Sequence, residues 1–221
     1  MFMEKSPQAL RSEALAKLAV KNLNKRNFAA FYCEDRQSAL AKALELTGSN
    51  DAVSWGDSVT LEVIGLLDVL RRRYNYIDRD SSEVWEERLQ LMQRGMLCDT
   101  FFLSANAISA EGILVNIDRT GNRTASMAFG PKQVVVIAGV NKLTATYGEA
   151  IARARNFAAA LNIQRTRFNG LKTPCKENGM CVNCICEDCL CNFIMTVRHG
   201  NTMIDGTPRI KVILVGENLG Y

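Results

Sequence analysis

Six of the chain's eight cysteines lie in one short stretch, residues 173–192, with the sequence TPCKENGMCVNCICEDCLCN. Thiolates are good ligands for zinc and for iron–sulfur clusters, and closely spaced thiols also serve in redox exchange. The stretch contains two C-x-x-C pairs, at 181/184 and 186/189, and such a turn points two sulfurs at one ion. These cysteines are therefore the first candidates for a metal centre or a redox device.

The two C-x-x-C pairs are too close together to form a zinc ribbon. A ribbon separates its pairs by about a dozen residues, so that two loops approach the ion from opposite sides. Here Ile185 alone separates the pairs. A four-ligand set spread over the stretch closes more easily, for example Cys175, Cys181, Cys184 and Cys191. Such a set suits zinc or an iron–sulfur cluster, and free or oxidisable thiols without a metal are the alternative.

Two other stretches are too polar for their positions. The first, residues 54–65, places Asp57, Ser58, Thr60 and Glu62 after a strand and in the first turn of a helix. Ligands of α/β sheets bind at such strand ends, and the N–H groups of a helix start favour an anion. Glu62 is a candidate general base or nucleophile. The alternative is helix capping by Ser58, with the acidic residues favouring the helix dipole.

The second polar stretch covers residues 116–132. Asp118 ends a strand and is another candidate base or nucleophile, and Arg123 follows a glycine turn, where it can clamp a carboxylate or phosphate. The alternative is a polar turn held by its own side-chain hydrogen bonds. Ligand binding is favoured because four polar side chains crowd near strand ends, namely Asn106, Asn116, Asp118 and Asn122.

The elements that must position these residues follow from hydrophobic periodicity. Helices are predicted over 8–25, 35–47, 60–72, 82–93 and 146–161. Strands are predicted over 28–33, 52–55, 74–78, 99–105, 112–118, 133–139, 193–197 and 209–216. Strands that alternate with helices indicate an open, mostly parallel sheet covered on both faces. We expect one three-layer α/β/α domain over 1–221, with an N-terminal helix in 1–27 packed on it and 173–192 as an insertion.

Composition narrows the function classes. The 221 residues are 48% hydrophobic and 23% charged, as in ordinary globular proteins, and a net charge of +4 without a long basic stripe argues against nucleic-acid binding. No apolar run approaches the roughly 20 residues that a membrane-spanning helix needs, and the N-terminus lacks a signal-peptide core. We expect a cytoplasmic protein without membrane association, whose thiols stay reduced. The single histidine, His199, argues against a Ser-His-Asp triad.

Several segments resemble the LUD domain family, which is named for lactate utilisation. They are the W-x-D-S-x-T pattern at 55–60, the block 99–143, KTPC at 172–175 and VILVGENLGY at 212–221. The resemblance runs from about residue 8 to the end of the chain. It implies a fold similar to the NagB/RpiA/CoA-transferase group. For some members it also implies an accessory role in L-lactate oxidation beside iron–sulfur partner proteins.

The family's cysteine pattern has counterparts in this chain. It falls on Cys175, Cys181, Cys184 and Cys191, while Cys186 and Cys189 are additions. The leading hypothesis is a metal- or iron–sulfur-dependent accessory or redox protein of L-lactate or related 2-hydroxy-acid metabolism. Its ligand would be a small anion, a 2-hydroxy acid or a phosphate ester, bound at the strand ends.

Two other functions stay open at this point. One is an enzyme that acts on a sugar phosphate or an acyl-CoA, as fold relatives do. The other is a regulatory or partner-binding module that is ordered by metal. The sequence leaves open whether the protein is an enzyme and whether it forms a homo-oligomer.

Overall fold

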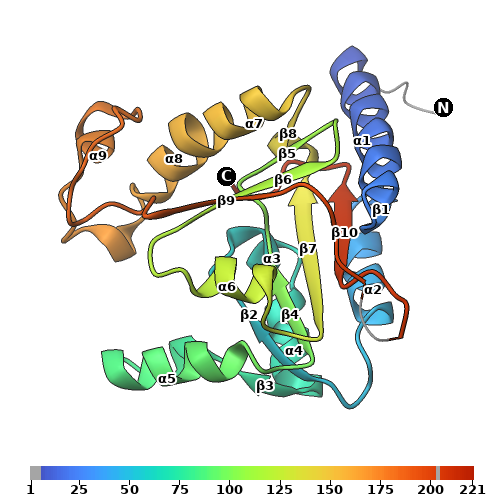
Figure 1. Ribbon diagram of the computed structural model, residues 1–221, viewed down its shortest axis with the longest axis horizontal. Helices are drawn as coiled ribbons and strands as arrows, with labels where there is room; N and C mark the ends of the chain where they lie inside the picture. The colour runs from blue at the N-terminus through green and yellow to red at the C-terminus, as the bar shows by residue number, and fades with distance from the viewer. Residues whose placement is uncertain (1–5, 203–204) are drawn as a thin grey trace.

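The computed structural model describes residues 6–202 and 205–221 and contains two sheets (Figure 1). The larger sheet has six parallel strands in the order β1-β10-β7-β4-β2-β3. Its strands are β1 (Ala29–Cys33), β2 (Ala52–Trp55), β3 (Asn75–Ile77), β4 (Thr100–Leu103), β7 (Gln133–Gly139) and β10 (Ile210–Val215). The predicted α/β fold with a mostly parallel central sheet is confirmed.

A second, smaller sheet was not predicted. It has the order β8-β5-β6-β9, and its strands are β5 (Ala107–Ser109), β6 (Ile113–Asp118), β8 (Leu143–Thr144) and β9 (Phe193–Val197). The pairs β5–β6 and β6–β9 are antiparallel. Every residue of β6 is buried, so its sequence has the same apolar pattern as a central parallel strand. Periodicity alone therefore could not assign this strand to a separate sheet.

Most of the predicted helices form close to their expected positions. The α-helices of the described residues are α1 (Pro7–Lys25), α2 (Arg36–Glu45), α3 (Val59–Val63), α4 (Leu66–Arg73), α5 (Trp85–Gly95), α6 (Asn122–Ala128), α7 (Tyr147–Arg153), α8 (Ala160–Asn162) and α9 (Pro174–Asn178). Of these, α6 and α9 were not predicted. Asp35 caps α2 and Ser58 caps α3 through side-chain hydrogen bonds, as the sequence predicts. The expected N-terminal helix over 1–27 forms as α1, and residues 1–5 of that range lie outside the described residues.

Three helix predictions need correction, and one of them is the helix expected over 146–161, which is divided into α7, a π-helical stretch and α8. The single helix expected over 60–72 is divided into α3 and α4 because Gly65 adopts a left-handed conformation, with φ of 74°. Ser82 does not begin α5, which starts at Trp85. The Ser82 hydroxyl instead accepts a hydrogen bond from the Val84 backbone N–H at 3.0 Å.

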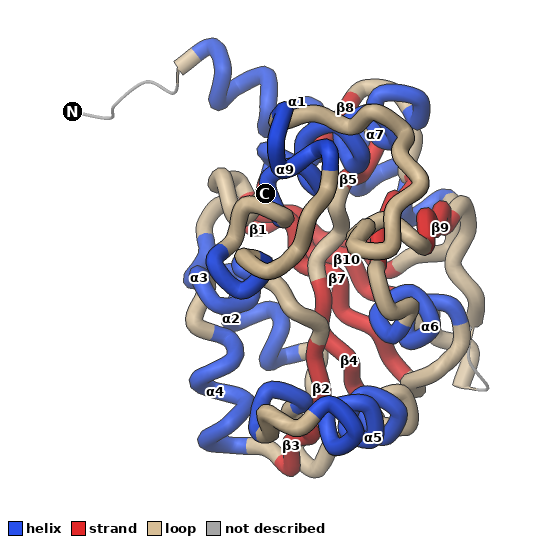
Figure 2. Tube along the Cα trace, turned by 90° about the vertical axis from the view of Figure 1, so that its left-hand side faces the viewer, coloured by secondary structure: helices blue, strands red, loops and turns tan. Residues whose placement is uncertain are grey.

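Helices lie on both sides of the large sheet, with α2, α3 and α4 to its left and α6 to its right in Figure 2, and a hydrophobic layer fills the space on each side. On one face, side chains of the central strands pack against α2, α3 and α4. On the other face they pack against α1 and α6 and against the small sheet. Ala150 and Ala154 then cover the far side of the small sheet. Since both faces of the large sheet are buried, its ends are the places where a polar site can form.

None of the described helices is long and apolar enough to cross a membrane.

Candidate functional site

A cavity of about 590 Å³ opens near the carboxyl ends of the central strands, and we call it the arginine cavity. Five arginines and two aspartates line it, which leaves a surplus of three positive charges. These residues are Arg79, Arg88, Arg119, Arg123, Arg167, Asp57 and Asp118. Trp85 and Phe168 add aromatic surface to its wall. Guanidinium groups around a concave site favour a carboxylate or phosphate ligand.

Asp57 holds two of the cations beside the cavity. Its Oδ2 accepts a hydrogen bond from Arg165 at 2.8 Å and lies 2.9 Å from Nη1 of Arg167. Burial acts to raise the pKa of Asp57, but Arg167, Arg165 and Arg79 outweigh it and hold the pKa below its ordinary value. Asp57 is therefore ionised at neutral pH and orders this side of the cavity.

Arg79 is weakly paired for a buried arginine. Its side chain is mostly buried, and its nearest ion-pair contact is the one between Nε and Asp80 at 3.8 Å. Its Nε has no hydrogen-bond partner among the described residues. Burial lowers the pKa of Arg79, with Arg123 and Arg167 acting in the same direction and Asp80 and Asp57 opposing it. A buried cation with an unpaired donor is a natural position for a ligand anion.

Asp118 and Arg123 are joined at the end of β6. Asp118 Oδ2 accepts from the backbone N–H groups of Arg123 at 2.8 Å and Thr124 at 3.2 Å, and so satisfies the first turn of α6. The Arg123 guanidinium lies 3.1 Å from Asp118 Oδ1 and donates to the Ile117 carbonyl at 2.7 Å. The turn therefore holds itself together through its own hydrogen bonds and also lines the arginine cavity, while ligand binding by this stretch stays a prediction.

Lys142 lies in a second, smaller cavity, which we call the lysine cavity. Its Nζ donates to the hydroxyls of Thr60 at 3.0 Å and Ser104 at 2.9 Å. Burial, followed by the nearby Arg153 and Arg123, lowers the pKa of Lys142 to about 7. The lysine and arginine cavities share four lining residues, namely Asp57, Asn106, Arg123 and Asn162. The amine therefore borders the same site as the arginines.

Five cysteines line a third, small cavity, which we call the cysteine cavity. They are Cys175, Cys181, Cys184, Cys189 and Cys191. Burial raises the pKa of Cys191, and the sulfurs of Cys181, Cys184 and Cys175 raise it further. Thiolates that repel one another in this way would be stabilised by a cation among them. The donor set is soft and therefore fits zinc or an iron–sulfur cluster.

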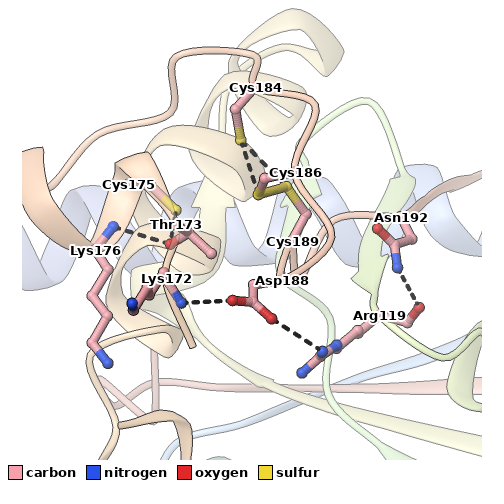
Figure 3. The surroundings of a disulfide bond; sticks show 10 residues. All are labelled: Arg119, Lys172, Thr173, Cys175, Lys176, Cys184, Cys186, Asp188, Cys189 and Asn192. Carbon is pink, nitrogen blue, oxygen red and sulfur yellow. Dashed lines mark hydrogen bonds and ion pairs between the residues drawn. A yellow bond between two sulfur atoms is a disulfide. The ribbon is translucent and has the colours of Figure 1, made fainter. Parts of the chain in front are cut away.

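Three of the cysteine sulfurs are especially close. Those of Cys184, Cys186 and Cys189 lie within 4.8 Å of one another. A disulfide joins Cys186 to Cys189, and Cys184 Sγ lies 3.3 Å from Cys189 Sγ (Figure 3). This disulfide was not predicted, although the C-x-x-C spacing brings the two Cα atoms to 5.5 Å, within disulfide range. When reduced, the three thiols would be close enough to share one ion.

The cysteine cavity lies beside the arginine cavity. Ala159 and Leu190 line both of them. Ala159 belongs to a π-helical stretch, Ala154–Ala159, that interrupts the helix predicted over 146–161, and such stretches occur frequently at functional sites. Asp188 links the cysteine-rich segment to the arginine cavity. Its carboxylate accepts a hydrogen bond from the Lys172 backbone N–H at 2.8 Å and lies 3.9 Å from the guanidinium of Arg119 (Figure 3).

Comparison with known proteins identifies the family. A family model described as the LUD domain matches residues 16–215. The chain belongs to the LUD domain family. The predicted resemblance is thereby confirmed for the family, while the reaction and ligand stay predictions.

One solved structure similar to this LUD domain is the crystal structure of a DUF162 family protein from Deinococcus radiodurans. It shares 10% sequence identity and has a TM-score of 0.49, over 96% of this chain and 99% of the other. A search of the curated proteins found no match.

The LUD domain brings most of the predicted ligand-binding residues together. The arginine cavity is lined by Asp57, Asn106, Asp118, Asn122 and Arg123, and the lysine cavity also by Ser58 and Thr60. Two predicted residues lie outside the lining of both cavities, within the described part of the chain. Asn116 is buried in β6 and donates to the Ser104 carbonyl at 2.9 Å, which supports the loop after β4. Glu62 is exposed on α3, because the buried side of that short helix carries Thr60 and Leu61.

Sequence reasoning missed several residues of the LUD domain site. These are Arg79, Arg88, Arg119, Arg165, Arg167 and Lys142. The arginines come from three parts of the chain, at 79–88, 119 and 165–167, and carry no shared motif. Lys142 did carry a signal, because it follows a fully apolar predicted strand, and side chains after such strands face the ligand edge of a parallel sheet.

Proposed function

We propose that this LUD-domain protein binds a small anionic molecule in the arginine cavity, beside a metal centre held in the cysteine cavity. In this proposal it is an accessory or redox protein of L-lactate or related 2-hydroxy-acid metabolism. The observation that carries the proposal is the shared wall of the two cavities, formed by Ala159 and Leu190. A ligand anion and a thiolate-bound group would be neighbours across that wall.

The charge distribution supports an anionic ligand. Most of the lining arginines share a carboxylate with another arginine, so their positive charge is only partly neutralised. Asp57 forms ion pairs with Arg167 and with the neighbouring Arg165. Asp80 forms ion pairs with Arg79 and Arg88. A carboxylate or phosphate that enters the cavity would find donors already positioned for it. Pre-positioned donors reduce the entropy cost of binding, so the site is suited to anion recognition.

The cysteines support a bound metal or cluster. Cys175, Cys181, Cys184 and Cys191 would hold the group, as the family pattern implies, and Cys189 borders the same cavity. An iron–sulfur cluster supplies one-electron transfer when it is bound, whereas zinc would supply only structural order or charge. The apolar lining of Val182, Leu190 and Ala159 would limit water around the group.

The test is elemental and ligand analysis of protein that has been purified without oxygen. We expect iron with acid-labile sulfide, or zinc, in a fixed ratio to the chain, together with thermal stabilisation by L-lactate or another 2-hydroxy acid. Colourless protein with one equivalent of zinc would remove the electron-transfer form of the proposal. Protein with no metal and no response to any anion would remove the proposal as a whole.

A second candidate function is favoured by the size of the arginine cavity. Its volume of about 590 Å³ lies within the range that holds drug-sized ligands, roughly 300–1,000 Å³. A 2-hydroxy acid would fill only part of it, whereas a sugar phosphate or an acyl-CoA would use more of it, with Trp85 and Phe168 available for stacking. The same thermal-shift panel, extended to sugar phosphates and CoA esters, separates the two candidates by which class stabilises the protein most.

A further inference from the structure

Lys142 is placed by three neighbouring strands of the large sheet. It follows β7, while Ser104 follows β4 and Thr60 lies shortly after β2, and these three strands are adjacent in the order β7-β4-β2. Both hydroxyls therefore meet the lysine amine at the carboxyl edge of the sheet, where α/β proteins bind their ligands. The side chain is only 5% exposed.

The hydrogen bonds of Lys142 match a neutral amine better than a charged one. A neutral amine has two N–H donors and one lone pair, and the hydroxyls of Thr60 and Ser104 accept two donors. The Thr60 hydroxyl itself donates to the Leu219 carbonyl at 3.1 Å, so its oxygen is oriented to accept from the lysine. A charged ammonium group would have a third N–H, for which none of the described residues offers an acceptor.

The charges around Lys142 also disfavour the ammonium form. No carboxylate of the described residues lies within ion-pairing distance of Nζ, and Arg123 from α6 and Arg153 from α7 are the cations that act on it. Asp57 and Arg165, which also line the lysine cavity, are bound to each other at 2.8 Å. A lysine amine that is buried away from water and lies near other cations loses its proton more easily, and the neutral amine is nucleophilic at neutral pH.

We propose that Lys142 is a nucleophile that forms an imine with the carbonyl carbon of a 2-oxo acid bound between the arginine and lysine cavities. This proposal rests on the proposed function for its ligand class, because a 2-oxo acid is the oxidised partner of a 2-hydroxy acid. Arg123 lines both cavities and is placed to hold the ligand carboxylate while the carbonyl faces Nζ. Imine formation would be an activity distinct from electron transfer.

The step needs no oxidant or reductant. The Nζ lone pair attacks the carbonyl carbon, the C–N bond forms, and the carbonyl π electrons move to oxygen, giving a carbinolamine after a proton passes from nitrogen to oxygen. The Ser104 hydroxyl, 2.9 Å from Nζ, is positioned to relay that proton. The nitrogen lone pair then forms the C=N bond as the C–O bond breaks, and the hydroxyl leaves as water with the remaining N–H proton. Once its nitrogen is protonated, the resulting iminium withdraws electrons from the neighbouring carbons more strongly than the ketone does, so it would labilise a bond at the adjacent carbon.

The test is reductive trapping of the full-length protein with pyruvate and sodium cyanoborohydride, followed by peptide mass spectrometry. We expect one covalent adduct per chain, on the peptide that contains Lys142, with labelling that rises through pH 7. The adduct should disappear in Lys142→Met. It should remain in Lys132→Met, a control in which an exposed lysine at the opposite end of β7 is changed.

The site of labelling in the wild-type chain decides the proposal even if Lys142→Met does not fold. Labelling spread over surface lysines, or absent from Lys142, overturns the proposal. Calorimetry with pyruvate, run in parallel, separates this failure from failure of the proposed function. Binding without an adduct leaves the anion site standing, whereas neither binding nor adduct removes both.

Discussion

The carboxylate of Asp57 lies 2.9 Å from Nη1 of Arg167, and this contact joins the loop after β2 to the short helix that follows α8. Arg165 binds the same oxygen at 2.8 Å. One carboxylate therefore organises two cations that approach from more than a hundred residues away in the chain. Since Asp57 and Arg165 are largely buried and Arg167 is about one-third exposed, the contact contributes to both stability and site geometry.

Replacing this carboxylate should destabilise the protein. Asp57→Asn leaves two partly buried guanidinium groups without their anion, so we expect the free energy of unfolding to fall by about 2 kcal/mol at pH 7. Urea denaturation measures the change. Asp68→Asn is the matched control, because that exposed carboxylate lies 4.0 Å from Arg71 and should contribute less than about 0.5 kcal/mol. Equal losses in the two variants would contradict the prediction.

The contribution of Asp57 should also depend on pH. Its folded pKa lies below the ordinary value of 3.8, so the unfolded chain takes up the proton first as the solution is acidified. The stabilisation is therefore complete above about pH 5 and is lost as the pH falls through the folded pKa. The difference in stability between wild type and Asp57→Asn should shrink below about pH 4. A difference that stays constant down to the acid unfolding transition would argue against this cause.

Arg79→Gln should weaken ligand binding without destabilising the ligand-free protein. Arg79 is a mostly buried cation whose Nε lacks a partner, so its removal relieves a desolvation cost while it deletes an anion contact. We expect the Kd for an anion such as L-lactate or ribose 5-phosphate to rise about tenfold or more. Arg94→Gln, at an exposed position on α5, is the control and should leave Kd unchanged. A loss of stability with unaltered binding would assign Arg79 a structural role instead.

Serine substitutions can determine which cysteines hold the metal. If the family set is used, Cys181→Ser and Cys191→Ser should lose most of the metal, while Cys186→Ser retains it. If the closest group of sulfurs is used, Cys186→Ser should lose the metal as Cys184→Ser does. Metal content is measured by mass spectrometry after anaerobic purification. Cys33→Ala changes a buried thiol outside the cysteine cavity and should leave the content unchanged in either case.

Metal should protect the segment 173–192 from proteolysis. Among its residues α9 is the one regular element, and the remainder is irregular, so its order depends on a few contacts such as that of Asp188 with Lys172. Binding free energy at such a site is local folding free energy. Limited proteolysis with and without chelator should show at least several-fold slower cleavage of the metal-bound form. Identical cleavage rates would count against a metal-ordered segment.

Gly65→Ala tests the break between α3 and α4. A Cβ at this position meets no atom within 4 Å, but the backbone has φ of 74°, so the expected loss is about 1 kcal/mol from conformation alone. Gly148→Ala is the paired control, since this position in α7 also has open space and no positive φ. There, alanine should raise the stability by up to about 1 kcal/mol. Thermal or urea unfolding of both variants gives the comparison.

The sequence alone predicted the alternation of strands and helices, because buried strands and amphipathic helices have different hydrophobic periods. It also identified the two polar strand ends, through Asp57 and Asp118, and the family cysteines. Local signals were sufficient for Ser58 and Asp35, whose capping depends only on the next few residues. These features depend on interactions over short distances in the chain.

Which charges share a cavity depends on how distant segments pack in three dimensions. Arg79, Arg88 and Arg167 come from three separate elements, and no sequence pattern relates their positions. The order of the strands, which is set by packing of the whole sheet, places Lys142 beside Thr60 and Ser104. Its altered pKa follows from that burial rather than from its neighbours in the chain. Electrostatics and desolvation depend on distance in space, and for this reason the sequence showed the strand ends but not the cationic site they form.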